Sequence, residues 1–197
     1  MSKGKWVQWI AISAVVLAVL LLGTGWAVRW QQRADIAQGS RTLPLAVESA
    51  NFADGGSMPQ RLGCDGADLS PELHWPAPPP GSRSLAIVMD DPDAPLGFVH
   101  WIVYNIPSGT RDIAEGASTQ GKLPQAAAEG FNGFGNAAYG GPCPPGAEPH
   151  HYVVRLYALD AKLDLAPGAT KQELAAAVQG HVLAQGHITG LYGRSGK

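Results

Sequence analysis

The 197-residue sequence predicts one mainly β domain, a sandwich with a helix near its end, preceded by an N-terminal transmembrane helix. Three observations predict this class: an uncharged apolar run near the N-terminus, short apolar runs bounded by Gly, Pro and Asp in the remainder, and the distribution of Pro and Gly. All 16 prolines and 21 of the 25 glycines follow residue 43. Because both residues disrupt helix interiors, this part of the chain cannot be a helical bundle or a coiled coil.

The apolar run covers residues 7–28, which are 22 residues without a charge, and about 20 apolar residues span a bilayer core as a helix. Trp6 and Trp9 at one end and Trp26 and Trp30 at the other are typical of membrane interfaces. We therefore expect an uncleaved membrane anchor, with a cleaved signal peptide as the alternative.

These features divide the chain into an anchor or uncleaved signal over residues 1–29, a polar juxtamembrane linker over residues 30–43 and a globular domain over residues 44–197. We expect a single-pass membrane protein whose domain is exported to the periplasmic or extracytoplasmic side. The basic residues on the two sides of the apolar run are nearly equal in number, so their charge says little about the orientation of the helix in the membrane. The globular part has 9 basic and 15 acidic side chains, and we expect no nucleic-acid partner, which would need a basic surface.

Several apolar runs in the globular part predict strands, and one of them, residues 84–89, is almost continuously apolar, as in strands buried on both faces. The predicted strands are Leu45–Phe52, Ser84–Met89, Val99–Ile106, Tyr152–Leu159 and His187–Tyr192.

One helix is predicted between the fourth and the fifth of these strands. Thr170 and Glu173 have the spacing of a capping box and mark its start, and we expect Gly186 to end it. Long connections are usually functional or packed by their own side chains. The predicted loops are residues 54–82, 107–136 and 140–150.

Acidic residues follow the strand over residues 84–89 directly, in the order Asp90-Asp91-Pro92-Asp93-Ala94-Pro95. The two prolines restrict the backbone, so the carboxylates of Asp91 and Asp93 have fixed directions at a strand end. A binding site is one interpretation. An ordinary turn, in which Asp and Pro are common, is the other.

The segment Tyr139–Gly146 can form neither a helix nor an interior strand, because it contains three glycines and three prolines. Its glycines leave backbone N–H groups accessible, and such loops bind anions through successive amides. A structural proline-rich connection is the alternative. The next predicted strand opens with two histidines, and the period of two places His150 and Tyr152 on one face and His151 on the other.

His100 begins a predicted strand seven residues after Asp93, so a short connection returns it to the same end of the sheet. Asp91, Asp93, His100, His150 and residues 140–146 are therefore expected to converge into a small polar pocket. A histidine in such a pocket can donate a hydrogen bond to an anion, or it can carry a proton.

The sequence gives little support to a nucleotide-binding, hydrolase or zinc site. Residues 133–138 fit the loose dinucleotide-binding pattern, but the glycines and proline of residues 140–142 exclude the helix that must follow. The sequence has no Gly-x-Ser-x-Gly or Walker A motif, and no Cys-x-x-Cys or His-Glu-x-x-His spacing for zinc. We therefore expect no metal and no cofactor.

The motifs, in this order, resemble those of the phosphatidylethanolamine-binding protein family, and more closely its bacterial branch of Raf kinase inhibitor-like proteins. The resemblance extends over about residues 45–193 and implies an antiparallel β-sandwich with a few peripheral helices. It also implies a small pocket at one end that holds anions such as phosphate or a phosphoethanolamine head group. The matching segments are Gly63–Leu73 with Trp75, Asp91–Pro95, Phe98–Trp101, Tyr139–Pro145 and His150–Tyr152.

Carried over by position, the resemblance implies ligand-binding roles for Asp91, Asp93, His100, Gly141, Cys143, Pro145, His150 and Tyr152. Two features depart from the family pattern: His151 stands where the family often has Arg, and the connection between residues 145 and 150 is short. The resemblance also brings Cys64 and Cys143 near the pocket. An exported domain favours a disulfide between them, and two buried free thiols are the alternative.

We expect a membrane-tethered binding protein for a small anionic or phosphorylated ligand, such as phosphoethanolamine. Inhibition of a protein partner, such as a kinase or a serine protease, is the further role that the resemblance implies. No nucleophile–base pair is evident, so we do not expect an enzyme. The alternative is a hydrolase or transferase in which His150 or His100 is the base and Asp91 orients it.

Overall fold

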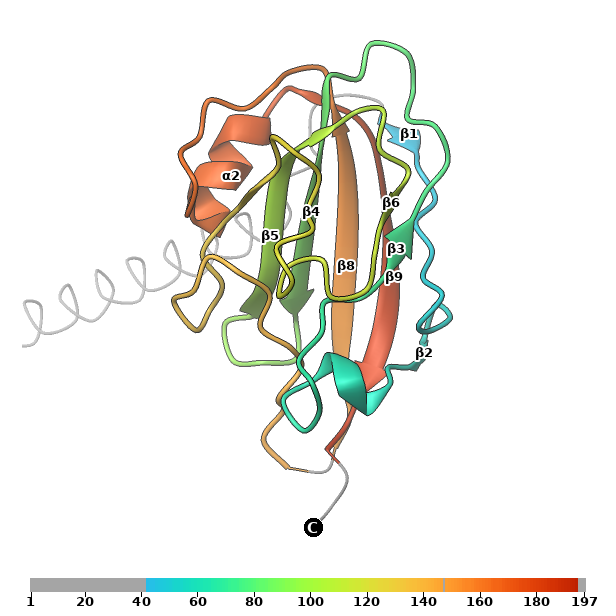
Figure 1. The fold of residues 1–197 in the computed structure, drawn as a ribbon, viewed down its shortest axis with the longest axis vertical. Coiled ribbons are helices and arrows are strands. Elements are labelled where there is room, and N and C mark those ends of the chain that lie inside the picture. The colour runs from blue at the N-terminus through green and yellow to red at the C-terminus, as the bar shows by residue number, and fades with distance from the viewer. Residues whose placement is uncertain (1–41, 147, 195–197) are drawn as a thin grey trace, which may run out of the picture. The chain divides into compact units, whose positions relative to one another are not determined.

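The computed structural model describes residues 42–146 and 148–194. Within these ranges the chain forms a seven-stranded sheet, a two-stranded sheet, one α-helix and one 3-10 turn, which confirms the mainly β prediction with a helix near the end (Figure 1). No helix of this described part is long and apolar enough to cross a membrane. The predicted anchor over residues 1–29, and the linker as far as residue 41, lie outside it.

The large sheet has the strand order β1-β9-β8-β4-β5-β7, and β2 also pairs with β9. Its central strands are antiparallel, but β1 and β2 run parallel to β9, so the antiparallel prediction is wrong at that edge. The elements are β1 (Leu43–Pro44), β2 (Gly56–Ser57), η1 (Gln60–Leu62), β3 (Leu73–His74), β4 (Ser84–Asp91), β5 (Phe98–Pro107), β6 (Asp112–Ile113), β7 (Ala128–Glu129), β8 (His150–Leu159), α2 (Lys171–Val178) and β9 (Val182–Tyr192).

Four of the five predicted strands are present as β4, β5, β8 and β9, and every residue of β4 is buried. The predicted strand Leu45–Phe52 is wrong. The amide of Leu45 donates to Gln185 of the large sheet, whereas Glu48 pairs with His74 of the small one. Because the chain crosses between the two sheets here, it cannot extend a ladder in either.

The helix begins at the predicted capping box, in which the side chains of Thr170 and Glu173 each bind the other's backbone N–H. It ends at Val178, earlier than predicted, and Gly186 lies within β9 instead. A Cβ on Gly186 would lie 1.7 Å from the carbonyl oxygen of Leu45. This glycine therefore admits the neighbouring edge segment and does not stop a helix.

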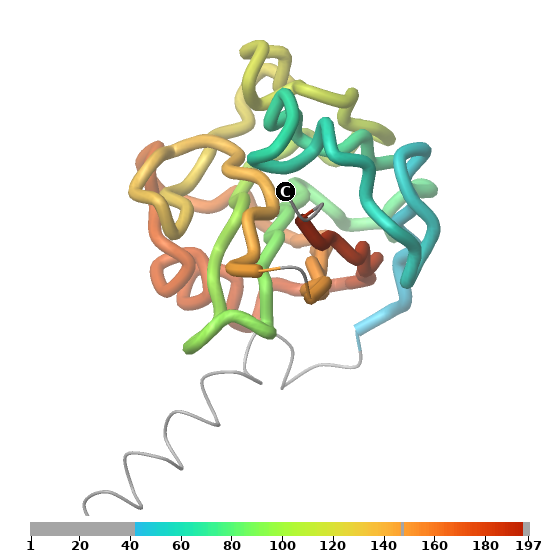
Figure 2. The backbone as a smooth tube through the Cα atoms, turned by 90° about the horizontal axis from the view of Figure 1, so that it is seen from below, coloured from blue at the N-terminus to red at the C-terminus, as the bar shows by residue number. Residues whose placement is uncertain are grey.

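The main core lies between the large sheet and a layer made of β3, β6 and the connections around them. Figure 2 shows residues 56–75 and 110–125 together on one side of the strands. Alternate residues of β4, such as Ile87 and Met89, point into this core. The other face is covered by the segment that leads into α2, where the Tyr104 hydroxyl donates to the carbonyl of Ala166. The second layer of the predicted sandwich is thus largely irregular in the described part of the chain.

Candidate functional site

A cavity of about 160 Å³ lies where β4 ends and β5 and β8 begin. Antiparallel pairing brings these ends together, since Asp91 pairs with Phe98 across β4 and β5, and β4 also pairs with β8. The cavity is small beside drug-sized sites of roughly 300–1,000 Å³, so it suits a head group or a small ion. It is lined by Asp91, Ala94, Pro95, Phe98, His100, Phe134, Cys143, Pro144, Pro145, His150 and Tyr152.

Six of the eight residues to which the resemblance assigns ligand-binding roles line the cavity, so the structure brings them together. Asp93 and Gly141 do not line it. The expected polar pocket is also more apolar than predicted, because proline, alanine and phenylalanine form most of its wall.

A buried hydrogen bond between a histidine and an aspartate forms the polar floor of the cavity. The Nδ1 of His150 donates to Oδ2 of Asp91 at 2.7 Å, because a carboxylate can only accept. The other oxygen of Asp91 accepts from the amides of Asp93, at 2.9 Å, and Ala94, at 3.0 Å. The Asp91 side chain is only 5% exposed, so these three donors stabilise its charge away from water. The Nε2 of His150 is the ring nitrogen that remains for a ligand or a proton.

The second histidine of the cavity, His100, is buried, and its Nδ1 donates to the carbonyl of Gly140 at 2.6 Å. Burial lowers the pKa of His100, while the carbonyl of Gly140 and the charge of Asp91 oppose this shift. The ring is therefore neutral at pH 7, and its Nε2 is an acceptor.

Tyr152 packs edge-to-face against His100, with ring centroids 5.1 Å apart. Its buried hydroxyl makes no hydrogen bond of good geometry in the described structure, but it lies close enough to the Asp91 carboxylate to interact with it. Burial raises the pKa of Tyr152, and the nearby Asp91 carboxylate raises it further, so the hydroxyl keeps its proton. A buried hydroxyl that is poorly paired within the protein is stabilised when it donates to a ligand atom.

Aromatic side chains that the sequence analysis did not select form one wall. Phe98 and Phe134 pack edge-to-face, with centroids 4.7 Å apart. The Asn132 side chain holds the loop that carries Phe134, since its oxygen accepts from the amides of Phe134 and Asn136 and its nitrogen donates to Ala138. The sequence signal that could have indicated this wall is the cluster of turn-forming Asn and Gly residues around Phe134. In the sequence analysis this segment was considered only as a dinucleotide-binding pattern.

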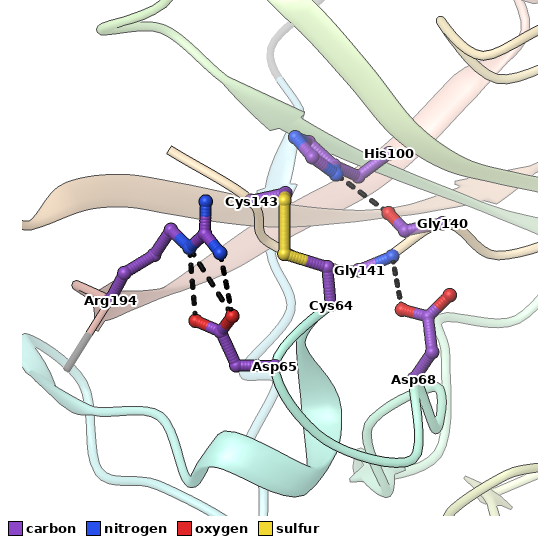
Figure 3. Close-up of a disulfide and its surroundings, with 8 residues drawn as sticks. All are labelled: Cys64, Asp65, Asp68, His100, Gly140, Gly141, Cys143 and Arg194. Carbon is purple, nitrogen blue, oxygen red and sulfur yellow. Dashed lines mark hydrogen bonds and ion pairs between the residues drawn. A yellow bond between two sulfur atoms is a disulfide. The ribbon is translucent and has the colours of Figure 1, made fainter. Parts of the chain in front are cut away.

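The loop over residues 140–145 does not offer the successive amides that we expected. The amide of Gly141 donates to Oδ1 of Asp68 at 2.7 Å, and the three prolines of the loop have no N–H. This loop contributes apolar walls to the cavity through Pro144 and Pro145. Asp68, which the sequence analysis did not select, fixes its start (Figure 3).

A disulfide joins Cys64 to Cys143, with their Cα atoms 5.4 Å apart (Figure 3). Both residues are exposed, unlike the buried thiols of the alternative. Cys143 also lines the cavity. Because its sulfur is bonded to another sulfur, Cys143 cannot act as a nucleophilic thiolate in this state.

Asp93 faces His151 and lies outside the cavity wall. Its Oδ2 accepts from the backbone amide of His151 at 2.8 Å and from the Nδ1 of the same residue at 2.7 Å. These bonds lower the pKa of Asp93. His151, which stands where the family often has Arg, is thus the partner of Asp93 on the exposed face of β8.

Within residues 42–146 and 148–194, no group of three or more His, Cys, Asp or Glu side chains could hold a metal ion. The site combines a buried Asp91–His150 hydrogen bond, a neutral histidine, a protonated hydroxyl and an apolar rim. Such a set can bind a small ligand that has both acceptor and donor groups.

The model of a known family, described as phosphatidylethanolamine-binding protein, matches residues 48–193. The chain belongs to the phosphatidylethanolamine-binding protein family. Among its relatives, a UPF0098 protein of Methanothermobacter thermautotrophicus is 44% identical over 151 residues, which cover 76% of this chain and 99% of the relative. The family resemblance inferred from the motifs is therefore confirmed.

Two further relatives add a structure and a cellular context. The crystal structure of the PEBP homologue CT736 from Chlamydia trachomatis has a TM-score of 0.71 and 33% identity, and the match covers 78% of this chain and all of CT736 (100%). LppC of Mycobacterium tuberculosis, whose name classes it as a candidate lipoprotein, is 40% identical over 151 residues, which are 76% of this chain and 72% of LppC.

Proposed function

We propose that this protein is a membrane-tethered binding protein whose cavity takes a small phosphorylated or other anionic ligand, such as phosphoethanolamine. The observation that carries the proposal is the Asp91–His150 hydrogen bond in a cavity of head-group size, with the buried hydroxyl of Tyr152 close to Asp91. The hydroxyl donates to a phosphate oxygen, and the Nε2 of His150 does so when the ring is protonated. The Nε2 of His100 accepts from an ammonium group.

The proposed tether rests on the sequence and on one relative. The uncharged run of 22 residues is long enough to span a bilayer, and the name of LppC points to membrane attachment of that protein. An anchored domain on the extracytoplasmic side is also consistent with an exposed disulfide, since disulfides persist in oxidising compartments.

Titration calorimetry tests the ligand. The full chain in detergent micelles is titrated with O-phosphoethanolamine, inorganic phosphate and ethanolamine, and we expect binding of the first that His150→Ala weakens. Asp90→Asn is the matched control, because Asp90 lies on the opposite face of β4 from the cavity. The proposal fails if none of the three compounds binds, or if both variants bind like the wild type.

A hydrolase is the second candidate, favoured by the Asp91–His150 pair, in which the carboxylate orients the ring and leaves Nε2 as a base. The described cavity holds no serine, threonine or free cysteine as nucleophile, so the base would have to activate water. Turnover of phosphomonoesters or carboxylic esters that disappears in His150→Ala would establish this activity. Equal turnover by the wild type and the variant would exclude it.

Inhibition of a protein partner, such as a kinase or a serine protease, is favoured by the exposed rim. Leu96, which follows the cavity-lining Pro95 in the sequence, is 84% exposed, and Phe134, which lines the cavity, is 53% exposed. Large apolar side chains that are exposed together often mark contact surfaces. A pull-down from membrane extracts with the wild type and with Leu96→Ser tests this role, and equal recovery of a specific protein by both would exclude the rim.

A further inference from the structure

The disulfide is placed where it can control the cavity. Cys143 lines the cavity, and so do the next two residues, Pro144 and Pro145. Both cysteines are exposed, so a thiol reductant can reach the bond from solvent.

Several contacts hold the segment that precedes Cys143. The amide of Cys64 donates to the carbonyl of Pro142 at 3.0 Å, and the amide of Gly141 donates to Asp68. Gly140 exchanges two hydrogen bonds with His100, at 2.6 and 2.9 Å. This part of the loop therefore stays in place without the disulfide.

The segment after Pro142 is held differently. The described residues from Cys143 to Pro149 make no hydrogen bond to the rest of the described chain, until His150 enters β8. Among the described residues of this segment, which exclude residue 147, the disulfide is the last covalent or hydrogen-bonded attachment of the Pro144–Pro145 wall before that strand. Proline has no N–H to donate, so this wall cannot replace the lost attachment with amide bonds of its own.

We propose that the Cys64–Cys143 disulfide is a redox gate of the cavity, in which reduction releases the Pro144–Pro145 wall and lowers ligand affinity. The inference rests on the proposed binding function. The reductant is a dithiol: one thiolate attacks a sulfur of the disulfide, and the second thiol resolves the mixed disulfide. The products are an oxidised reductant and the two thiols of Cys64 and Cys143, with two electrons and two protons transferred.

The loop that carries Cys64 is expected to keep its position when the disulfide is reduced. Arg194 forms a bidentate ion pair with Asp65, next to Cys64, and Asp68 holds Gly141 (Figure 3). The cavity floor also persists, because the Asp91–His150 bond joins β4 to β8. Reduction therefore changes one wall and leaves the polar groups in place.

Calorimetry with O-phosphoethanolamine compares the oxidised full chain, the chain reduced with dithiothreitol, and a Cys64→Ser/Cys143→Ser double variant. Maleimide labelling verifies two thiols in the reduced sample. We expect the dissociation constant to rise about tenfold on reduction, because the wall is no longer preorganised, and to recover on reoxidation. Arg194→Gln removes a neighbouring ion pair without breaking the disulfide, and should bind like the wild type. Reduced protein that binds within about twofold of the oxidised protein overturns the gate.

Hydrogen–deuterium exchange separates this inference from the proposed ligand. Reduction should speed exchange at residues 143–150 and leave that of β4 unchanged. If no probe binds the oxidised chain, the ligand proposal fails while this measurement still tests the gate. Unchanged exchange at residues 143–150 overturns the gate. Faster exchange in β4 as well overturns it too, because the disulfide would then be a general staple of the fold.

Discussion

Two adjacent carboxylates at the end of β4 have opposite environments. Successive side chains of a strand point to opposite faces, so Asp90 and Asp91 project to different sides of the sheet. On the outer face, Asp90 binds the guanidinium of Arg155 and the ammonium of Lys171, the latter at 2.7 Å. On the cavity face, Asp91 binds two backbone amides and the ring of His150.

The difference lies in the partners and in the space beside them. Asp90 is paired with a guanidinium and an ammonium group, and these ion pairs join β4 to β8 and α2. Asp91 is hydrogen-bonded to an imidazole and to two backbone amides, and it lines a cavity. Asp90 thus stabilises the fold, whereas Asp91 belongs to the candidate site. The alternation of side chains along the strand decides which of the two faces each aspartate occupies.

The largest effect that would test this division is expected from Asp91→Ala. Removing Asp91 takes away the charged acceptor that orients the His150 ring in the cavity, and we expect this to cost about 1.5–3 kcal/mol of binding free energy, which is at least about a tenfold loss of affinity. Calorimetry with O-phosphoethanolamine measures the loss, and circular dichroism shows that the β fold is kept. Wild-type affinity in the folded variant would place the ligand elsewhere.

Asp90→Asn should show the reverse behaviour. It weakens two ion pairs between β4, β8 and α2, and we expect it to lower the free energy of unfolding by about 1–2 kcal/mol. Urea denaturation measures this change. Ligand affinity should remain within about twofold of the wild type, and a larger loss would show that the two faces are coupled.

The strand period explains how much of this site was predictable. Asp91, His150 and Tyr152 lie at strand ends, where the period of two fixes the face and the register fixes the neighbours. Asp93 does not line the cavity, because it lies beyond β4 in a turn whose direction the period does not determine. Phe134 is on a loop organised by Asn132, and no periodic pattern marks such a residue.

The same limit explains the errors in the fold. The strands β4, β5 and β8 bury consecutive apolar residues and could be located from composition. The edge of the sheet at β9 depends on contacts between residues far apart, such as Leu45 with Gln185, and local patterns do not encode them. Residues 182–186 therefore seemed to continue a helix, although pairing with β8 holds them in the sheet.

A smaller effect is expected from pH, through the neutral His100 of the cavity face. Burial lowers the pKa of His100 in the folded state, whereas an unfolded chain has a histidine pKa of about 6.5. Below about pH 6.5 the unfolded chain therefore binds more protons than the native state, and stability falls as the pH drops. At pH 5.5 this group should cost at most about 1.4 kcal/mol relative to pH 7.5.

Urea denaturation of the wild type and of His100→Asn at both pH values isolates this contribution. The amide nitrogen of Asn can donate to the carbonyl of Gly140 in place of Nδ1, but it does not titrate. We expect the variant to lose less stability than the wild type between the two pH values. Equal losses would show that His100 does not set the pH dependence of this face.

The smallest effect is expected from His151→Ala. This variant tests whether the exposed Asp93–His151 pair contributes less to stability and binding than the buried Asp91–His150 pair. The His151 and Asp93 side chains are 55% and 42% exposed, and the amide of residue 151 continues to donate to Asp93 when the imidazole is removed. Exposed ion pairs contribute about 0–1 kcal/mol, so we expect a change in unfolding free energy below about 0.5 kcal/mol and an affinity within about twofold of the wild type. Urea denaturation and calorimetry under the conditions used for Asp91→Ala measure both quantities. A tenfold or larger loss of affinity, by contrast, would mean that the ligand extends past the rim to His151, and the cavity would then be only part of the binding site.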